Sequence, residues 1–232
     1  NRCDRIVISS PSFKEYFVNE LKIANKGFNL VNQPIIESNE KLDPIVFKNK
    51  HNFVYAGNIG SVQMIDKLVE SLKFTKTNDL KLYLIGNGSQ LKSIQKLIID
   101  EGLSEKVECV GSLPISKTET YFANADALIV SLKNDGYVGK TIPNKVIQFL
   151  KYGRPILGII GGDSKELLSK ANGTVFCEEN SKNIAENMDI LCNMSQKEKD
   201  TRGLNNKEYF ERNFRTEKLT QLLLNELIEV KK

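Results

Sequence analysis

The stretch NFVYAGNIGSVQMIDKLVESL, residues 52–72, decides the fold class of this chain. It opens with Asn52–Ala56, a short apolar run that is typical of a buried strand. Two glycines follow, Gly57 and Gly60. The apolar residues after them recur at helical spacing: Ile65, Leu68, Val69 and Leu72. The stretch therefore predicts a strand, a tight turn and a helix, the repeating unit of parallel α/β sheets.

The same alternation continues in both directions along the chain. Seven more apolar runs have the length of strands: Arg5–Ser9, Phe28–Asn32, Lys81–Ile85, Val107–Val110, Ala127–Ser131, Pro155–Ile160 and Thr174–Cys177. Helical stripes lie between them, and one of these ends at Gly102 as a predicted C-cap. We expect an α/β fold with a doubly wound parallel sheet, covered by helices on both faces.

The chain divides unevenly. Residues 1–44 contain two predicted strands and a helix at roughly Phe13–Leu21, too little for a stable sheet, and the polar stretch Glu37–Pro44 resembles a linker. We expect residues 1–44 to be the tail of a preceding domain, cut from a longer protein, and residues 45–210 to form a complete domain. Residues 211–232 are expected to form a C-terminal helix. Its predicted apolar face carries Leu219, Leu222, Leu223 and Leu227.

Composition excludes several classes of protein. The 232 residues are 40% hydrophobic and carry a net charge of +4, and the basic residues are spread along the chain. A nucleic-acid binder would cluster them, so no nucleic acid is expected, whereas weak attraction to an anionic membrane surface stays open. No metal site is expected either, because the four cysteines form no CxxC pair and the one histidine, His51, is read as a surface or edge residue. The cysteines favour a reducing compartment.

Three loops are candidates for binding a ligand. The turn at Gly57 precedes a helix, whose N-terminus favours anions, and phosphate contact and a plain turn remain equal alternatives. It lacks the three-glycine spacing of a dinucleotide site. For Gly86-Asn87-Gly88 we favour a turn that caps a helix at Ser89.

The third loop, residues 134–145, is the richest. It leads into a helix that starts near Pro143, with Lys140 and Lys145 beside it. Two ammonium groups, a glycine-bearing loop and a helix N-terminus favour binding of a diphosphate. Helical spacing buries Val146, Phe149 and Leu150, and leaves Asn144, Lys145 and Gln148 on the side available to a ligand. Asp126 and Asp163 are read as helix or loop caps.

From residue 53 onward the chain resembles a known family. The segments VYAGNIG, LYLIGNGSQ, VECVGSLP, ADALIVSL, TIPNKVIQFLKYGRPIL and NGTVF resemble the C-terminal donor domain of retaining glycosyltransferases of the GT-B fold, of the group 1 or family 4 type. Many of these enzymes build bacterial surface polysaccharides. DRIVISSPSFKEYF and FNLVNQPII are similar to the last elements of the family's acceptor domain.

The resemblance implies two Rossmann-like domains that face a cleft in the cytoplasm or at the inner face of the membrane. A nucleotide sugar would bind the C-terminal domain and a glycan or lipid-linked acceptor would enter from the other. No metal or cofactor would be needed, since basic groups and helix dipoles neutralise the leaving diphosphate. The protein would transfer the sugar with retention of configuration.

The chain departs from the family at four positions. Asn58 and Gln63 stand where many members carry an Arg and a Lys on the diphosphate, and Lys140 and Gln148 stand where they carry two glutamates. We expect Lys140 to be the catalytic residue. The expected donor-binding residues are Gly57, Asn58, Gly60, Ser61, Gln63, Gly86, Asn87, Ser112, Leu113, Gly139, Thr141, Pro143, Lys145 and Gln148.

Two alternatives follow from these departures. A non-catalytic partner subunit could hold a nucleotide sugar without reacting. A UDP-sugar epimerase would share the architecture but would need acidic residues in the cleft, and the matching positions are not acidic.

Overall fold

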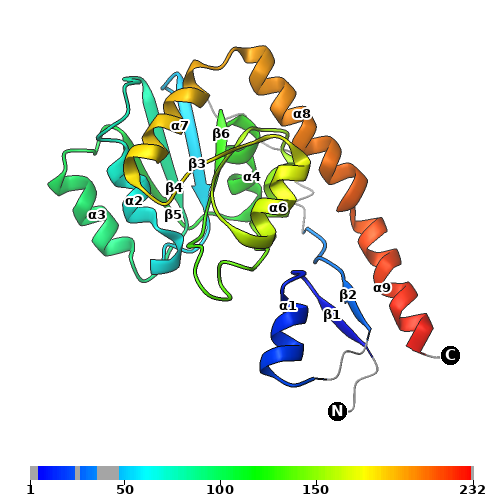
Figure 1. Cartoon of the computed structure of the whole chain (residues 1–232). Coiled ribbons are helices and arrows are strands. Elements are labelled where there is room, and N and C mark those ends of the chain that lie inside the picture. Colours follow the sequence, from blue (N-terminus) through cyan, green and yellow to red (C-terminus); the bar gives the residue numbers. More distant parts are fainter. Residues whose placement is uncertain (1–4, 24–26, 36–46, 231–232) are drawn as a thin grey trace.

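The computed structural model describes residues 5–23, 27–35 and 47–230. The linker predicted at Glu37–Pro44, Cys3 and the end of the predicted C-terminal helix at residues 231–232 lie outside these ranges. Figure 1 shows a large sheet covered by helices, a small N-terminal unit below it, and two helices that run down one side to the C-terminus.

The large sheet has six parallel strands in the order β5-β4-β3-β6-β7-β8. The strands are β3 (His51–Ala56), β4 (Leu80–Ile85), β5 (Val107–Gly111), β6 (Ala127–Ser131), β7 (Ile156–Ile159) and β8 (Thr174–Phe176). Each matches a predicted strand to within two residues. The doubly wound parallel sheet is thereby confirmed.

Helices cover both faces of this sheet (Figure 1). They are α2 (Ile65–Ser71), α3 (Leu91–Asp100), α4 (Ile115–Asn124), α5 (Asn144–Lys151), α6 (Gly162–Ala171), α7 (Ser181–Asn193) and α8 (Gln196–Asn213), with a short 3₁₀ turn, η2, at Ser61–Gln63. One buried cluster contains the apolar faces of α5, α6 and α8, and the other those of α2, α3 and α7. All six residues of β3 are buried, as two covered faces require.

The N-terminal unit is a small βαβ element. It consists of β1 (Ile6–Ile8), α1 (Phe13–Glu15), the π-helix η1 (Tyr16–Glu20) and β2 (Phe28–Leu30), and its two strands pair in parallel. The predicted strand, helix and strand are confirmed. The C-terminal helix α9 (Thr216–Val230) reaches this unit, where Arg5 pairs with Glu229 at 3.0 Å and Asn29 contacts Glu226.

The C-terminal region differs from the prediction of one helix over residues 211–232. Helix α8 continues to Asn213, and α9 begins at Thr216 after a break at Phe214, whose buried ring anchors the turn. Of the predicted apolar face, Leu219 is buried, whereas Leu222, Leu223 and Leu227 are exposed. The prediction missed the long α8, because its sequence is strongly polar and Phe210 is the one hydrophobic residue among its buried positions, which also include Lys199, Gly203 and Asn206.

Helix α8 packs very closely on the turn that follows α5. A Cβ atom on Gly203 would lie 2.0 Å from the carbonyl oxygen of Gly153. Asn206, which is fully buried, donates its side-chain N–H to the carbonyl of Arg154 at 2.8 Å. This close approach fixes the position of α8 against the turn that follows α5.

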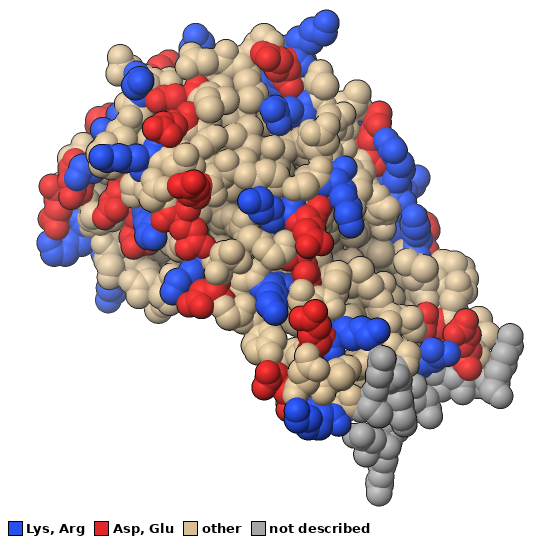
Figure 2. All heavy atoms as spheres, viewed as in Figure 1, with Lys and Arg blue, Asp and Glu red and all other residues tan. Residues whose placement is uncertain are grey.

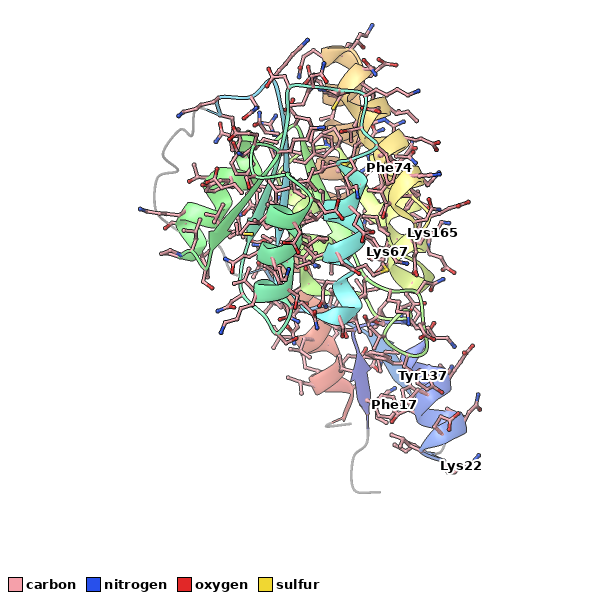
Figure 3. All side chains as sticks on the ribbon, turned by 90° about the vertical axis from the view of Figure 1, so that its left-hand side faces the viewer. Phe17, Lys22, Lys67, Phe74, Tyr137 and Lys165 are labelled. Carbon is pink, nitrogen blue, oxygen red and sulfur yellow. The ribbon has the colours of Figure 1, made fainter. Side chains whose placement is uncertain are left out.

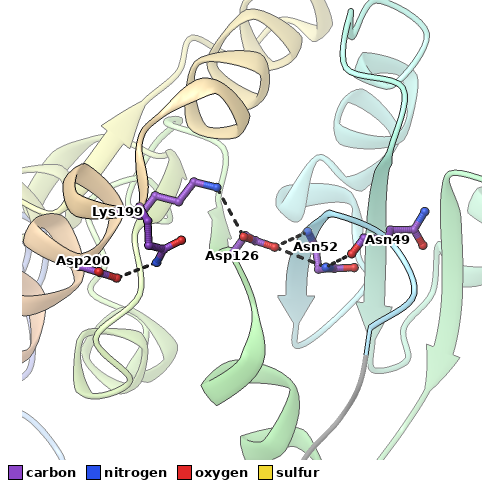
Figure 4. Close-up of polar contacts among 6 residues, drawn as sticks. Asn49, Asn52, Asp126, Lys199 and Asp200 are labelled. Atoms are coloured by element: carbon purple, nitrogen blue, oxygen red, sulfur yellow. Dashed lines mark hydrogen bonds and ion pairs between the residues drawn. The ribbon is translucent and has the colours of Figure 1, made fainter.

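A polar network joins α8 to the amino ends of the central strands (Figure 4). The Asp126 carboxylate accepts the backbone N–H of Asn52 at 2.8 Å and lies 3.5 Å from Nζ of Lys199. Asp126 therefore links two strands and a helix rather than capping one element. His51, read from the sequence as a surface or edge residue, is the buried first residue of β3 near this edge, and burial is the main cause that lowers its pKa.

Charge is dispersed over the face that Figure 2 shows, where Lys and Arg alternate with Asp and Glu. This pattern agrees with the sequence, in which no basic cluster was found. None of the helices within the described ranges combines the length and the apolar character that crossing a bilayer requires.

We expect Gly203→Ala to destabilise the protein by about 1–3 kcal/mol, because the added methyl group would displace α8 from the Gly153 turn. Thermal unfolding would then shift downward by roughly 2–4 °C for each kcal/mol. Leu204→Ala is the matched control, since Leu204 is 56% exposed on the same helix and should change stability by less than about 0.5 kcal/mol. A Gly203→Ala protein as stable as the wild type would contradict this account of the packing.

Candidate donor site at the carboxyl edge of the sheet

The candidate site lies at the carboxyl ends of β3 and β6. The chain runs outward from β3 through β4 to β5, then returns to β6 on the other side of β3. At such a switch point the loops leave in opposite directions and open a crevice, where open α/β sheets bind ligands. The loop that follows β6 faces the N-terminal unit (Figure 1).

Lys145 brings a positive charge to this switch point. Its Nζ donates to the Tyr55 hydroxyl at 3.1 Å and lies 4.4 Å from the centre of the Tyr55 ring. A Cβ atom placed on Gly57 would be 3.5 Å from the same Nζ. The structure thus joins two predicted features, the Gly57 turn and Lys145.

Burial lowers the pKa of Lys145 to about 8. No ion pair between Lys145 and a carboxylate is formed within the described residues. A poorly solvated ammonium group without a carboxylate partner is suited to receive an anionic ligand.

The turns after β3 and β4 pack backbone against backbone. Gly86 has φ +131°, and a Cβ atom there would lie 2.0 Å from the Gly57 carbonyl oxygen. Gly88 approaches Ile59 in the same way, and the Ile59 N–H donates to the Asn87 carbonyl at 2.8 Å. Glycine is needed at 86 and 88 for this close approach. The helix cap predicted at Ser89 is wrong, because α3 begins at Leu91 with Gln90 in the cap position.

This packing occupies part of the predicted anion-binding turn. The Gly57 N–H donates to the Ile85 carbonyl at 2.9 Å, and the Gly60 N–H donates to Oε1 of Gln63 at 3.1 Å. Asn58 also donates to Gln63 Oε1, at 3.2 Å. Asn58 and Gln63, which stand where the family often carries cations, therefore bind each other beside the exposed residue Ser61.

The loop between β6 and α5 carries Lys140, whose ion-pair partner lies in the N-terminal unit. Its Nζ lies 3.7 Å from Oε2 of Glu15 on α1, and its side chain is 44% exposed. Both predicted lysines lie over a tyrosine ring, Lys140 at 5.6 Å from the centre of Tyr137, but only Lys140 also pairs with a carboxylate among the described residues. Gly139 is buried in the tight turn before Lys140, and the Thr141 hydroxyl donates to the Val138 carbonyl.

The N-terminal unit contacts this loop at several points. The Ser10 hydroxyl accepts the Ile142 N–H at 2.8 Å, and Asn144 donates to Gln33 at 2.7 Å. Two of the groups expected near a ligand at the start of α5 are therefore already bound.

Asp163 is part of the same contact. Its carboxylate accepts the Ser12 N–H at 2.8 Å and the Ser12 hydroxyl at 2.7 Å. Asp163, predicted to cap a helix or loop, thus binds Ser12, the residue that precedes α1 in the N-terminal unit.

Aromatic rings complete this contact. The Tyr137 ring lies 4.6 Å from that of Tyr16, and its hydroxyl donates to Glu20 at 3.2 Å. Figure 3 shows Tyr137 beside the segment that carries Phe17.

The remaining predicted residues lie around the same edge. Pro143 occupies the N-cap position of α5, and Gln148 is half-buried on that helix, whereas Val146, Phe149 and Leu150 are fully buried as expected. Asn87 and Ser112 are exposed, and Leu113 is half-buried after β5. Within the described ranges no group of His, Cys, Asp and Glu side chains could hold a metal ion.

Two residues of this edge were missed. Tyr55 contacts Lys145, and a tyrosine in an apolar strand just before a glycine turn was a signal for it. Ser131 ends β6 with a fully buried hydroxyl that finds no partner among the described residues. A polar residue that closes an apolar strand was the corresponding signal.

Known proteins share this sequence pattern and this fold. A profile of the family described as "Glycosyl transferases group 1" matches residues 38–208. The probable glycosyltransferase WbjE of Pseudomonas aeruginosa is 25% identical over 114 residues, which are 49% of this chain and 28% of WbjE.

Solved GT-B structures share the fold at low identity. HepE of Anabaena, in complex with UDP and glucose, superposes with a TM-score of 0.79 at 12% identity, over 98% of this chain and 64% of HepE. TarM of S. aureus gives 0.75 at 16% identity, over 97% of this chain and 44% of TarM. The chain spans less than two thirds of each of these relatives. Because the family profile covers most of the described sheet domain, the chain belongs to the group 1 glycosyl transferases.

Proposed function

We propose that the protein is a glycosyltransferase that moves a sugar from a nucleoside diphosphate to a hydroxyl group of a glycan or lipid-linked acceptor, with retention of configuration. Residues 45–210 would form the donor domain and residues 1–44 the end of the acceptor domain. The observation that carries this proposal is the Lys145 ammonium group, held at the switch point with a tyrosine as its neighbour instead of a carboxylate.

The chemistry that this site offers is neutralisation of a leaving group. As the bond between the sugar and the diphosphate breaks, negative charge grows on the diphosphate. A preorganised cation in a poorly solvated site stabilises such charge strongly. We assign that role first to Lys145. Lys140 would contribute as well if it exchanged its Glu15 partner for the charged donor. The mechanism proposed here uses side-chain charge in place of a metal ion.

The exposed loops around Lys145 would provide the remaining donor contacts. Asn58 and Gln63 can exchange their mutual hydrogen bond for a phosphate oxygen. Gln148 is proposed to bind the ribose, and the backbone at Ser112 and Leu113 the base. The relative WbjE is described only as a probable glycosyltransferase. We propose a place in surface-polysaccharide synthesis, with a cytoplasmic reaction at the inner face of the membrane.

Lys145→Met tests the central contact, since it removes the charge but keeps an unbranched apolar chain. We expect affinity for UDP, GDP or TDP, whichever the wild type binds, to fall at least about tenfold in calorimetric titrations. The rate of sugar transfer by the full-length protein should fall on the order of a hundredfold. Lys140→Ala should have a smaller effect on binding, because that ammonium group already has a carboxylate partner.

Lys96→Ala is the matched control, since Lys96 is an exposed residue of α3 that pairs with Asp100. It should leave affinity unchanged. Equal affinity in Lys145→Met and the wild type would refute the proposed site. Nucleotide binding without any transfer by the full-length protein would instead favour the non-catalytic partner subunit.

Donor affinity should also depend on pH. The Lys145 pKa is lowered to about 8 in the free protein, so the ammonium group is charged at pH 7 and loses its proton as the pH rises past 8. A bound diphosphate would stabilise the charged form and raise this pKa. Affinity should therefore be constant near pH 7 and decrease above about pH 8. Calorimetry at several pH values measures this, and a flat profile up to pH 9.5 would contradict it.

A further inference from the structure

Tyr55 is a fully buried residue whose one polar atom lies at the functional edge of the sheet. Its ring belongs to the apolar cluster between the sheet and α2, where a phenylalanine would fill the same space. The hydroxyl, however, has two partners. It donates to the Asn58 carbonyl at 2.6 Å and accepts from Nζ of Lys145 at 3.1 Å.

One side chain therefore connects both halves of the candidate donor site. Through Asn58 it holds the turn after β3, and through Lys145 it holds the first turn of α5. The Lys145 Nζ also lies 4.4 Å from the ring centre, so the electron-rich ring faces the cation. A carboxylate in this place would neutralise the ammonium group, whereas a neutral tyrosine orients it and leaves its charge for a ligand.

We propose that Tyr55 is the positioning residue of the donor site, which holds the Lys145 ammonium group over the Gly57 turn and favours its charged form. This inference rests on the proposed function, because the charge so held would serve the donor's diphosphate. Tyr55 acts through Lys145 and need not touch the donor itself.

If Tyr55 positions Lys145, it should also change the pKa of Lys145. If Tyr55 only fills space in the core, it should not. By accepting a hydrogen bond, the Tyr55 hydroxyl stabilises the protonated form of Lys145. Burial raises the pKa of Tyr55, so this hydroxyl stays neutral throughout the relevant range. Burial lowers the pKa of Lys145, and the hydrogen bond to the Tyr55 hydroxyl would oppose that shift.

Tyr55→Phe removes the hydroxyl and keeps the ring. We expect about tenfold weaker nucleotide binding at pH 7.5, as for the loss of a hydrogen bond to a charged group, and a decrease in affinity that begins at a lower pH than in the wild type. Tyr83→Phe is the matched control. Tyr83 is a buried tyrosine of β4 that packs against Phe47 and Tyr121, so its variant should keep both the affinity and the pH profile of the wild type.

A double-mutant cycle separates action through Lys145 from a general effect. If Tyr55 acts through Lys145, adding Tyr55→Phe to Lys145→Met should cause no further loss of affinity. Labelling with acetic anhydride, read by mass spectrometry, gives the Lys145 pKa without any nucleotide, and Tyr55→Phe should lower it. In the wild type, UDP should protect Lys145 but not Lys96 from the reagent. This measurement does not depend on whether a variant folds.

The outcomes distinguish this inference from the proposed function. If Tyr55→Phe keeps the affinity, the pH profile and the Lys145 pKa of the wild type, the inference is wrong while the donor site stands. A full additional loss in the Lys145→Met background also overturns it. If the wild type binds none of the three nucleotides and UDP does not protect Lys145, the proposed function fails, and the inference fails with it.

Discussion

A single ammonium group at the switch point of the sheet organises the candidate site. Lys145 projects from the first turn of α5 onto Tyr55 of β3, with burial lowering its pKa. A charge in this environment is costly unless polar groups surround it. The tyrosine hydroxyl and ring reduce that cost without cancelling the charge. This arrangement is the basis of our proposal that the site receives an anion.

The packing of the neighbouring turns determines how many backbone N–H groups could bind a phosphate beside Lys145. Because the Gly57 and Gly86 turns touch through their backbones, the Gly57 and Ile59 N–H groups serve the protein's own structure. Backbone donors at a strand end often bind phosphate. Here side chains would carry more of that task, and we propose Asn58 and Gln63 of the same turn for it.

The N-terminal unit adds a second constraint on the same loops. Ser10, Ser12 and Glu15 contact Ile142, Asp163 and Lys140, so the N-terminal unit meets the loops at the carboxyl edge of the sheet. Helix α9 holds the unit from the other side through Glu229. Movement of this unit would change the position of Lys140 more than that of Lys145, whose partner belongs to the central sheet.

Periodicity in the sequence was sufficient for the strands and the doubly wound order, because a strand covered on both faces must be apolar throughout and a tight turn requires glycine. It also placed Gly57 and Lys145 in one region, since carboxyl ends of parallel strands share an edge.

Only the tertiary structure decided which groups meet there. The pairing of Lys140 with Glu15, of Asp163 with Ser12 and of Lys145 with Tyr55 depends on side-chain directions and on contacts between distant segments. Helix α8 escaped prediction for the same reason: apart from Phe210, it is held by close backbone approach at Gly203 and by a buried amide, which give no repeating apolar pattern.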